Sequence, residues 1–124
     1  MTLALLVLAL LVALLAFVLV LAFVAALAFE AGFDLNFDWS FYNRTVSIFA
    51  SGTNASYLGN QHNITYGAVP IGKEKVRFTS NHDQCAWDGT AIDIYGGMDA
   101  SLAAFAATLF YPGVPLIYPG HAIG

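Results

Sequence analysis

The sequence predicts an α/β fold in which short strands alternate with helices after a long apolar N-terminal segment. Two observations carry this prediction. The chain of 124 residues changes character at Glu30, since Thr2 is the one polar side chain before it and every formal charge lies from Glu30 onward. Beyond that boundary, period-two runs typical of strands are interleaved with segments of helical periodicity. Strand, helix, strand, helix, strand is the order of a parallel α/β sheet.

Residues 1–29 predict a long apolar helix. At about 1.5 Å per residue it would be about 43 Å long, which exceeds the roughly 30 Å hydrocarbon core of a bilayer. A secretory signal is the competing interpretation, although no Lys or Arg precedes the run. A low-complexity artefact of a misassigned gene start is the third. The first two interpretations predict a membrane-anchored or a secreted protein.

Residues 30–124 are expected to form one small domain. The formal net charge of −4 and the lack of a basic patch argue against a nucleic-acid partner. Cys85 has no second cysteine to pair with, so we expect a free thiol. Three Asn-X-Ser/Thr triplets, which begin at Asn43, Asn54 and Asn63, would be glycan acceptors on surface loops in a secretory setting.

The first half of this domain predicts a strand, a helix and a loop. Residues 33–41, FDLNFDWSF, alternate apolar and polar side chains and predict a strand, at least at their start. Beyond Trp39 the apolar spacing also fits a short helix that ends near Gly52. Residues 51–73 hold Gly, Asn, Ser, Thr and Pro with few apolar neighbours, and predict a loop.

The second half predicts two further strands around a helix. Residues 76–79 predict a strand that runs into Asn81-His82-Asp83, and Asp88-Gly89 marks a turn. Residues 114–118 predict the last strand, after Pro112-Gly113 has ended the helix. We expect Asp99 to cap that helix, and its apolar face to consist of Leu102, Phe105, Ala106 and Leu109.

Three sequence blocks then resemble one enzyme family. FTSNHD (78–83) is preceded by FDLNFDW (33–39) and followed by AFAATLFYPGVPLIYPG (104–120). In this order they resemble the C-terminal part of the catalytic barrel of the α-amylase family, glycoside hydrolase family 13, over about residues 30–124. The resemblance implies a partial (β/α)8 TIM barrel that contains the region of the sixth to eighth strands.

The same resemblance implies a role for each member of the Asn-His-Asp cluster. Asp83 would be the carboxylate that stabilises the transition state, His82 would bind the same sugar, and Asn81 would support the turn. Hydrogen bonds from sugar hydroxyls to an ionised carboxylate, strengthening as the ring distorts, lower the barrier. The implied substrate is an α-glucan or maltodextrin, with no cofactor, and Trp87 is a candidate stacking surface. Without the flanking blocks, the cluster would instead be predicted to cap the end of a strand.

The two carboxylates needed for retaining glycoside hydrolysis, roughly 5 Å apart, cannot be located. The resemblance places the general acid within residues 20–29, which are apolar, and Glu30 fits better as the first charge after the apolar run. Asp34 and Asp38 would lie about 13 Å apart along a strand, so we expect them to be solvated. His62 is expected at the surface, and no spacing suggests a metal site. The chain alone is therefore predicted to be inactive.

A second class of function fits the same residues. The chain could be a non-enzymatic, membrane-anchored glycoprotein whose amylase-like ectodomain binds a partner. A three-stranded sheet also leaves two open edges and an uncovered apolar face. Either the apolar helix covers that face or, as we expect for residues 30–124 in isolation, the protein associates with itself.

Overall fold

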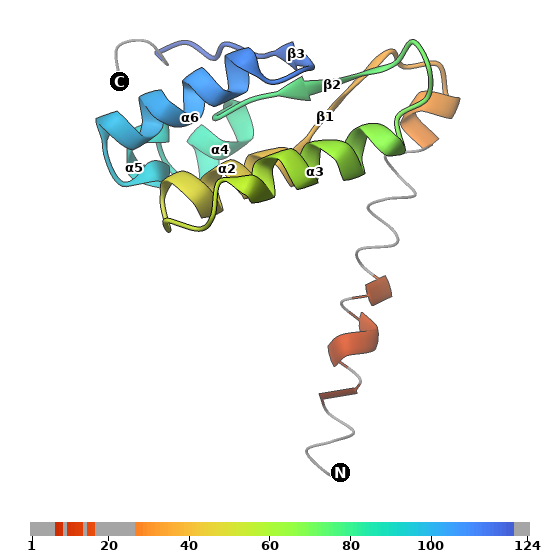
Figure 1. The fold of residues 1–124 in the computed structure, drawn as a ribbon, viewed down its shortest axis with the longest axis horizontal. Helices are drawn as coiled ribbons and strands as arrows, with labels where there is room; N and C mark the ends of the chain where they lie inside the picture. Colours follow the sequence, from red (N-terminus) through yellow and green to blue (C-terminus); the bar gives the residue numbers. More distant parts are fainter. Residues whose placement is uncertain (1–6, 9, 14, 17–26, 121–124) are drawn as a thin grey trace. The chain divides into compact units, whose positions relative to one another are not determined.

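The computed structural model describes residues 7–8, 10–13, 15–16 and 27–120. The chain forms two compact units, residues 1–36 and 37–124 (Figure 1). In chain order the elements are β1 (Leu35–Phe37), α2 (Trp39–Phe49), α3 (Ser56–Gly67), β2 (Glu74–Arg77), α4 (His82–Trp87), α5 (Ala91–Tyr95), α6 (Met98–Phe110) and β3 (Val114–Pro115).

Most of the predicted apolar helix, residues 1–29, lies outside the described residues. Its described pieces, 7–8, 10–13 and 15–16, are helical and exposed. Residues 27–30 form one further helical turn, in which the amide of Ala31 donates to the carbonyl of Leu27 at 2.8 Å. Within the part of the chain that the structure describes, no helix has the length and apolar character needed to span a bilayer.

The three strands form one sheet in the order β1-β2-β3. Strands β2 and β3 are parallel, with Val76 opposite Val114 and Arg77 opposite Pro115. The predicted α/β class with a parallel sheet is therefore confirmed. The strands are shorter than predicted at their carboxyl ends, because β2 stops at Arg77 and β3 at Pro115.

The strand predicted over residues 33–41 exists only near its start. Strand β1 ends at Phe37, and Asp38 then caps helix α2, since its Oδ1 accepts a hydrogen bond of 3.0 Å from the amide of Phe41. An Asp at this position satisfies one of the amides that a helix N-terminus leaves unpaired. The local cap thus prevails over the period-two pattern.

The loop predicted over residues 51–73 is wrong, because α3 occupies its centre. The helix begins after Asn54, whose Oδ1 accepts a hydrogen bond of 2.9 Å from the amide of Ser56. Leu58 is its buried anchor. Two of the expected glycan acceptors, Asn43 and Asn63, accordingly lie in α2 and α3 rather than in loops, although both are exposed.

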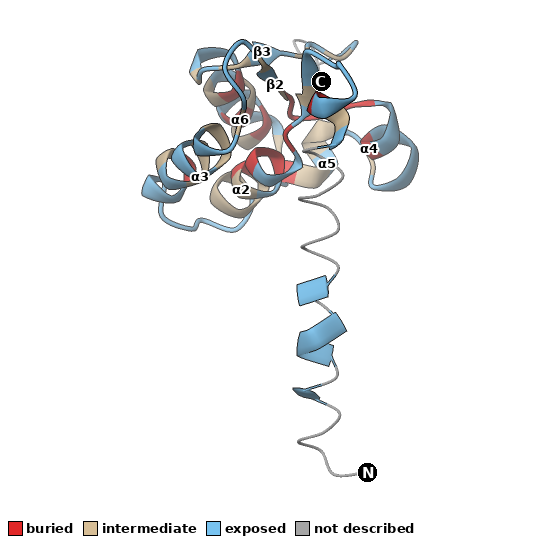
Figure 2. Ribbon diagram, turned by 90° about the vertical axis from the view of Figure 1, so that its right-hand side faces the viewer, coloured by how far each residue is buried: buried red, intermediate tan, exposed pale blue. Residues whose placement is uncertain are grey.

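The core of the unit formed by residues 37–124 is largely aromatic. Phe41, Tyr42, Phe78 and Tyr95 are buried in it (Figure 2). The rings of Tyr42 and Phe78 stack with their centres 5.1 Å apart, and Trp39 meets Phe78 edge-on at 5.1 Å. Burial of aromatic rings in such pairs adds about 0.5–1.5 kcal/mol per pair beyond the area effect.

Helix α6 buries a different face from the predicted one. Its buried residues are Ser101, Ala104 and Thr108, whereas Leu102 and Leu109 are exposed. Helix α6 contacts α2 and α5, and small side chains allow helices to approach closely. The hydroxyl of Thr108 donates to the carbonyl of Ala104 at 2.9 Å, so its burial leaves no donor unpaired. Asp99 lies in the first turn, after the N-cap Gly97, and is not the cap.

Candidate functional site

The Asn-His-Asp cluster follows the carboxyl end of β2, at the start of α4. The connecting residues Phe78, Thr79 and Ser80 are buried, and so is Asn81. The side chain of Asn81 caps α4, since its Oδ1 accepts hydrogen bonds of 2.9 Å from the amide of Asp83 and 3.0 Å from that of Gln84. A fully packed segment and a cap therefore fix where the next two side chains begin.

His82 and Asp83 point their side chains into solvent from the first turn of α4. They are 73% and 54% exposed, and His82 Nε2 lies 3.3 Å from Asp83 Oδ1. An imidazole and a carboxylate held side by side on an open surface offer one donor or acceptor and two acceptors to a hydroxylated ligand. The structure thus brings together the three residues that the sequence selected, with Asn81 inside and the other two outside.

The amide nitrogen of Asn81 has a different environment from its oxygen. Nδ2 is buried and has no hydrogen-bond partner among the described residues. An unpaired buried donor costs about 1–3 kcal/mol. Asn81 therefore contributes to the cluster mainly through its oxygen, which holds the first turn of α4.

Around the cluster, the described residues form an open surface with one small cavity. Trp87, at the end of α4, is 84% exposed and available to stack on a ligand. A cavity of about 100 Å³ lies beside Ser80 and Cys85, whose Oγ and Sγ are 3.1 Å apart. That volume is well below the roughly 300 Å³ of small ligand pockets. A sugar on His82 and Asp83 would therefore lie on the surface. Cys85 is a free thiol, as predicted, but is exposed.

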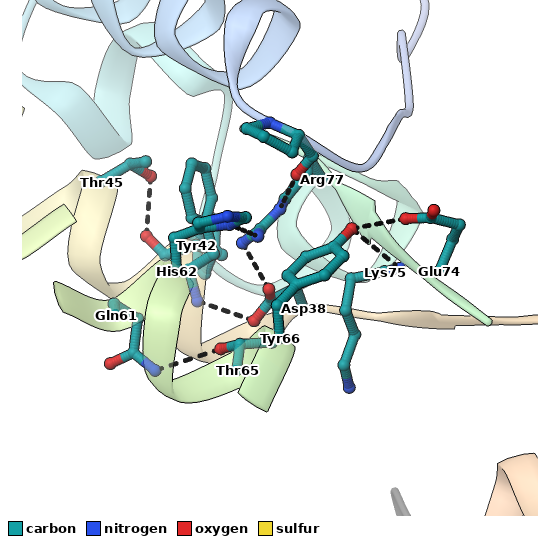
Figure 3. A network of polar contacts seen from close by, with 12 residues as sticks. Asp38, Tyr42, Thr45, Gln61, His62, Thr65, Tyr66, Glu74, Lys75 and Arg77 are labelled. Carbon is teal, nitrogen blue, oxygen red and sulfur yellow. Dashed lines mark hydrogen bonds and ion pairs between the residues drawn. The ribbon is translucent and has the colours of Figure 1, made fainter. Parts of the chain in front are cut away.

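A second constellation, centred on Arg77 at the end of β2, lies on α2 and α3 (Figure 3). Its guanidinium is fully buried and forms an ion pair with Asp38. Nε donates to the carbonyl of Pro112 at 3.1 Å, and Nη2 lies 2.9 Å from Nδ1 of His62. The guanidinium carbon also lies 3.9 Å from the ring centre of Phe41.

Two expectations are corrected by this network. Asp38 is 2% exposed rather than solvated, because it caps α2 and neutralises Arg77. His62 is not a simple surface residue, because its ring packs against Tyr66 at 4.7 Å and Tyr111 at 5.6 Å. One sequence signal could have revealed the network: Asp38 stands directly between a strand pattern and a helix pattern, which is an N-cap position.

Burial shifts the pKa values of several groups around Arg77. It lowers the pKa of His62, an effect to which the charge of Arg77 adds and which the charge of Asp38 partly offsets. Burial and a hydrogen bond of 2.7 Å to Glu74 raise the pKa of Tyr66. Burial also lowers the pKa of Lys75. These residues belong to a packed and partly desolvated network, whereas the Asn-His-Asp cluster is open to water.

The described residues hold no group of three or more His, Cys, Asp or Glu side chains arranged to bind a metal ion. Comparison with known proteins found no matching family model, no similar curated protein and no similar solved structure. The chemistry available at the cluster is therefore that of one exposed imidazole beside one exposed carboxylate.

Proposed function

We propose that this chain is a fragment of an α-amylase-like glycoside hydrolase, a family acting on α-glucans. The observation that carries the proposal is the position of Asn81-His82-Asp83 after the carboxyl end of β2. The strands follow one another in sheet order, as successive strands of a (β/α)8 barrel do. Active sites of such barrels lie at the carboxyl ends of the strands.

In this proposal Asp83 is the catalytic residue that stabilises the transition state, and His82 binds the same sugar. Both are accessible, and their separation of 3.3 Å lets adjacent hydroxyls of one ring reach both. Asn81 is a positioning residue, since it acts through the two amides that it caps. Trp87 supplies a stacking face.

The chain alone is proposed to lack hydrolytic activity, because glycoside cleavage needs a nucleophile and a general acid in addition to Asp83. The segment where the resemblance places the acid, residues 20–29, contains no ionisable side chain. Reducing-sugar release from starch by purified protein tests this proposal. Release that is abolished by Asp83→Asn would overturn it.

Binding of a sugar without cleavage tests the role of the cluster directly. Two groups offer too few bonds for tight binding, and millimolar affinity, about −4.1 kcal/mol at 1 mM, is expected for maltose. Ligand-observed NMR should detect this binding, and His82→Ala and Asp83→Ala should abolish it. Asp88→Ala is the matched control, because it removes an exposed carboxylate from the other end of α4. Binding unchanged in all three variants would reduce the cluster to a helix cap.

The second candidate is a non-enzymatic, membrane-anchored glycoprotein with a partner-binding ectodomain. The observation that favours it is the exposure of large apolar side chains, among them Ile71, Trp87 and Phe110. Such side chains are a common feature of interaction sites. A stoichiometric membrane partner recovered on pull-down, together with no sugar binding, would favour this candidate over the first.

A further inference from the structure

A polar hollow of about 270 Å³ lies on α2 and α3, and no residue of the Asn-His-Asp cluster lines it. Its walls are Ser40, Asn43, Arg44 and Ser47 from α2 and Gln61 from α3. The four α2 residues are spaced at i, i+3, i+4 and i+7, so they project from one face of the helix. The lining contains one cation and no carboxylate.

Arg44 is the unusual member of this lining. Its Nε is buried and has no hydrogen-bond partner among the described residues, and none of their carboxylates lies within ion-pair distance. The guanidinium carbon lies 5.4 Å from the ring centre of Tyr57. Arg77, in contrast, is paired through Nε, Nη1 and Nη2. A buried charged donor without an acceptor indicates that the acceptor comes from outside the chain.

Two of the other lining residues are already engaged. The hydroxyl of Ser47 donates to the carbonyl of Asn43 at 2.9 Å, and the amide of Gln61 donates to Thr65 Oγ1 at 3.3 Å. The hydroxyl of Ser40 and the side-chain amide of Asn43 remain as donors on the same face as Arg44. Three donor side chains then converge on one hollow.

We propose that this hollow binds a phosphate group, with Arg44 as its principal donor. The planar guanidinium donates two parallel hydrogen bonds to phosphate oxygens, which satisfies Nε. Ser40 and Asn43 donate to the remaining oxygens, which a planar carboxylate would not offer in that number. The phosphate is either free or carried as a monoester on a larger molecule. Because the chain has a formal net charge of −4, which opposes anion binding, we expect millimolar affinity.

The chain contains two arginines, Arg44 and Arg77, so their Nε–H signals in a ¹H–¹⁵N spectrum give a site-specific measurement. The full chain, in a non-ionic detergent, is titrated with inorganic phosphate at constant ionic strength. The Arg44 signal should shift and saturate, whereas the Arg77 signal, whose Nε–H is held by Pro112, should stay in place. Methyl phosphate replaces inorganic phosphate in a second arm, and tighter binding there would identify a monoester as the ligand. An equal shift with sodium chloride or acetate, or no shift, would overturn the proposal.

Variants separate the hollow from the overall charge. Arg44→Gln should weaken phosphate binding, followed by ³¹P NMR, by about tenfold or more, which is the usual effect of losing a hydrogen bond to a charged group. Ser40→Ala, which keeps the charge, should also weaken it. Lys73→Gln makes the same charge change outside the lining and should alter affinity by less than about twofold. Equal losses in Arg44→Gln and Lys73→Gln would mean that only net charge is being measured, and would overturn the proposal.

Discussion

The carboxylate of Asp38 and the guanidinium of Arg77 form an ion pair that is almost completely removed from water, with 2% and 0% of the two side chains exposed. Asp38 follows β1 directly, and Arg77 ends β2. The pair therefore joins two strand ends to the helix that Asp38 caps.

Removing one partner of this pair should be strongly destabilising. Asp38→Asn keeps a capping oxygen for Phe41 but leaves Arg77 buried without its counter-charge, a change that typically costs about 3–5 kcal/mol. Denaturant unfolding of the full chain measures the loss. The double variant Asp38→Asn/Arg77→Met removes the unpaired charge and should be more stable than Asp38→Asn alone. A loss below about 1 kcal/mol, the range of exposed pairs, would contradict the buried pair.

Protonation of His62 should reduce stability at acidic pH. Its pKa is lowered by burial and by Arg77, so the unfolded chain binds this proton more readily than the folded one. Stability from this group is present above the unfolded pKa of about 6.5 and is lost as pH falls through it towards the folded pKa. The slope for one proton cannot exceed about 1.4 kcal/mol per pH unit. Unfolding curves from pH 8 to 5 should steepen for the parent chain and flatten in this window for His62→Asn.

The cap at Asn81 should tolerate Asp better than Ala. Asn81→Ala removes the acceptor of two amides and should cost about 1 kcal/mol or more. Asn81→Asp keeps an acceptor and removes the buried donor that has no partner among the described residues. Its stability should lie between those of the parent and Asn81→Ala in thermal unfolding. Equal stability of the parent and Asn81→Ala would show that the cap contributes nothing.

Gly113 should not tolerate a side chain. It has a φ of +135°, and a Cβ there would lie 2.8 Å from Arg77 Cγ and 2.9 Å from the carbonyl oxygen of Lys75. Backbone strain and the clash with backbone each cost about 1–3 kcal/mol. Gly52→Ala is the matched control, since φ is +71° and nothing lies within 4 Å of its Cβ. Denaturation midpoints should fall clearly further for Gly113→Ala than for Gly52→Ala.

Exposed apolar side chains should make residues 30–124 self-associate. Phe110, at the end of α6, is 87% exposed, and Ile117 after β3 is 61% exposed. Size-exclusion chromatography of this segment should show an elution volume that depends on concentration. Phe110→Lys should shift the equilibrium towards monomer. A parent protein that elutes as a monodisperse monomer at every concentration would refute this expectation.

Sequence patterns could predict the strand positions and α6, because alternation and apolar spacing directly reflect which backbone geometry buries apolar groups. They failed for α3, whose Gly59, Asn60 and Asn63 disfavour a helix. Tertiary contacts stabilise α3 instead, through Leu58 and through His62 beside Arg77. Periodicity cannot report such contacts from segments distant in sequence.

The face of α6 was mispredicted for a related reason. Period 3.6 identifies an apolar stripe but not whether a neighbour covers it. The structure covers Ser101, Ala104 and Thr108 instead. At the candidate site, the contiguous Asn81, His82 and Asp83 could be selected from sequence, because a strand end and a cap are local features. The Arg77 network could not, because its members meet only in three dimensions.

The sequence separations within the Arg77 network have a consequence for the order of folding. Its guanidinium joins partners 39, 35 and 15 residues away, namely Asp38, Pro112 and His62. Contacts of such separation must overcome the entropy of closing long loops before they contribute any energy. The network therefore completes after the rate-limiting barrier, and its bonds act mainly by slowing the escape of the folded chain rather than by hastening its formation.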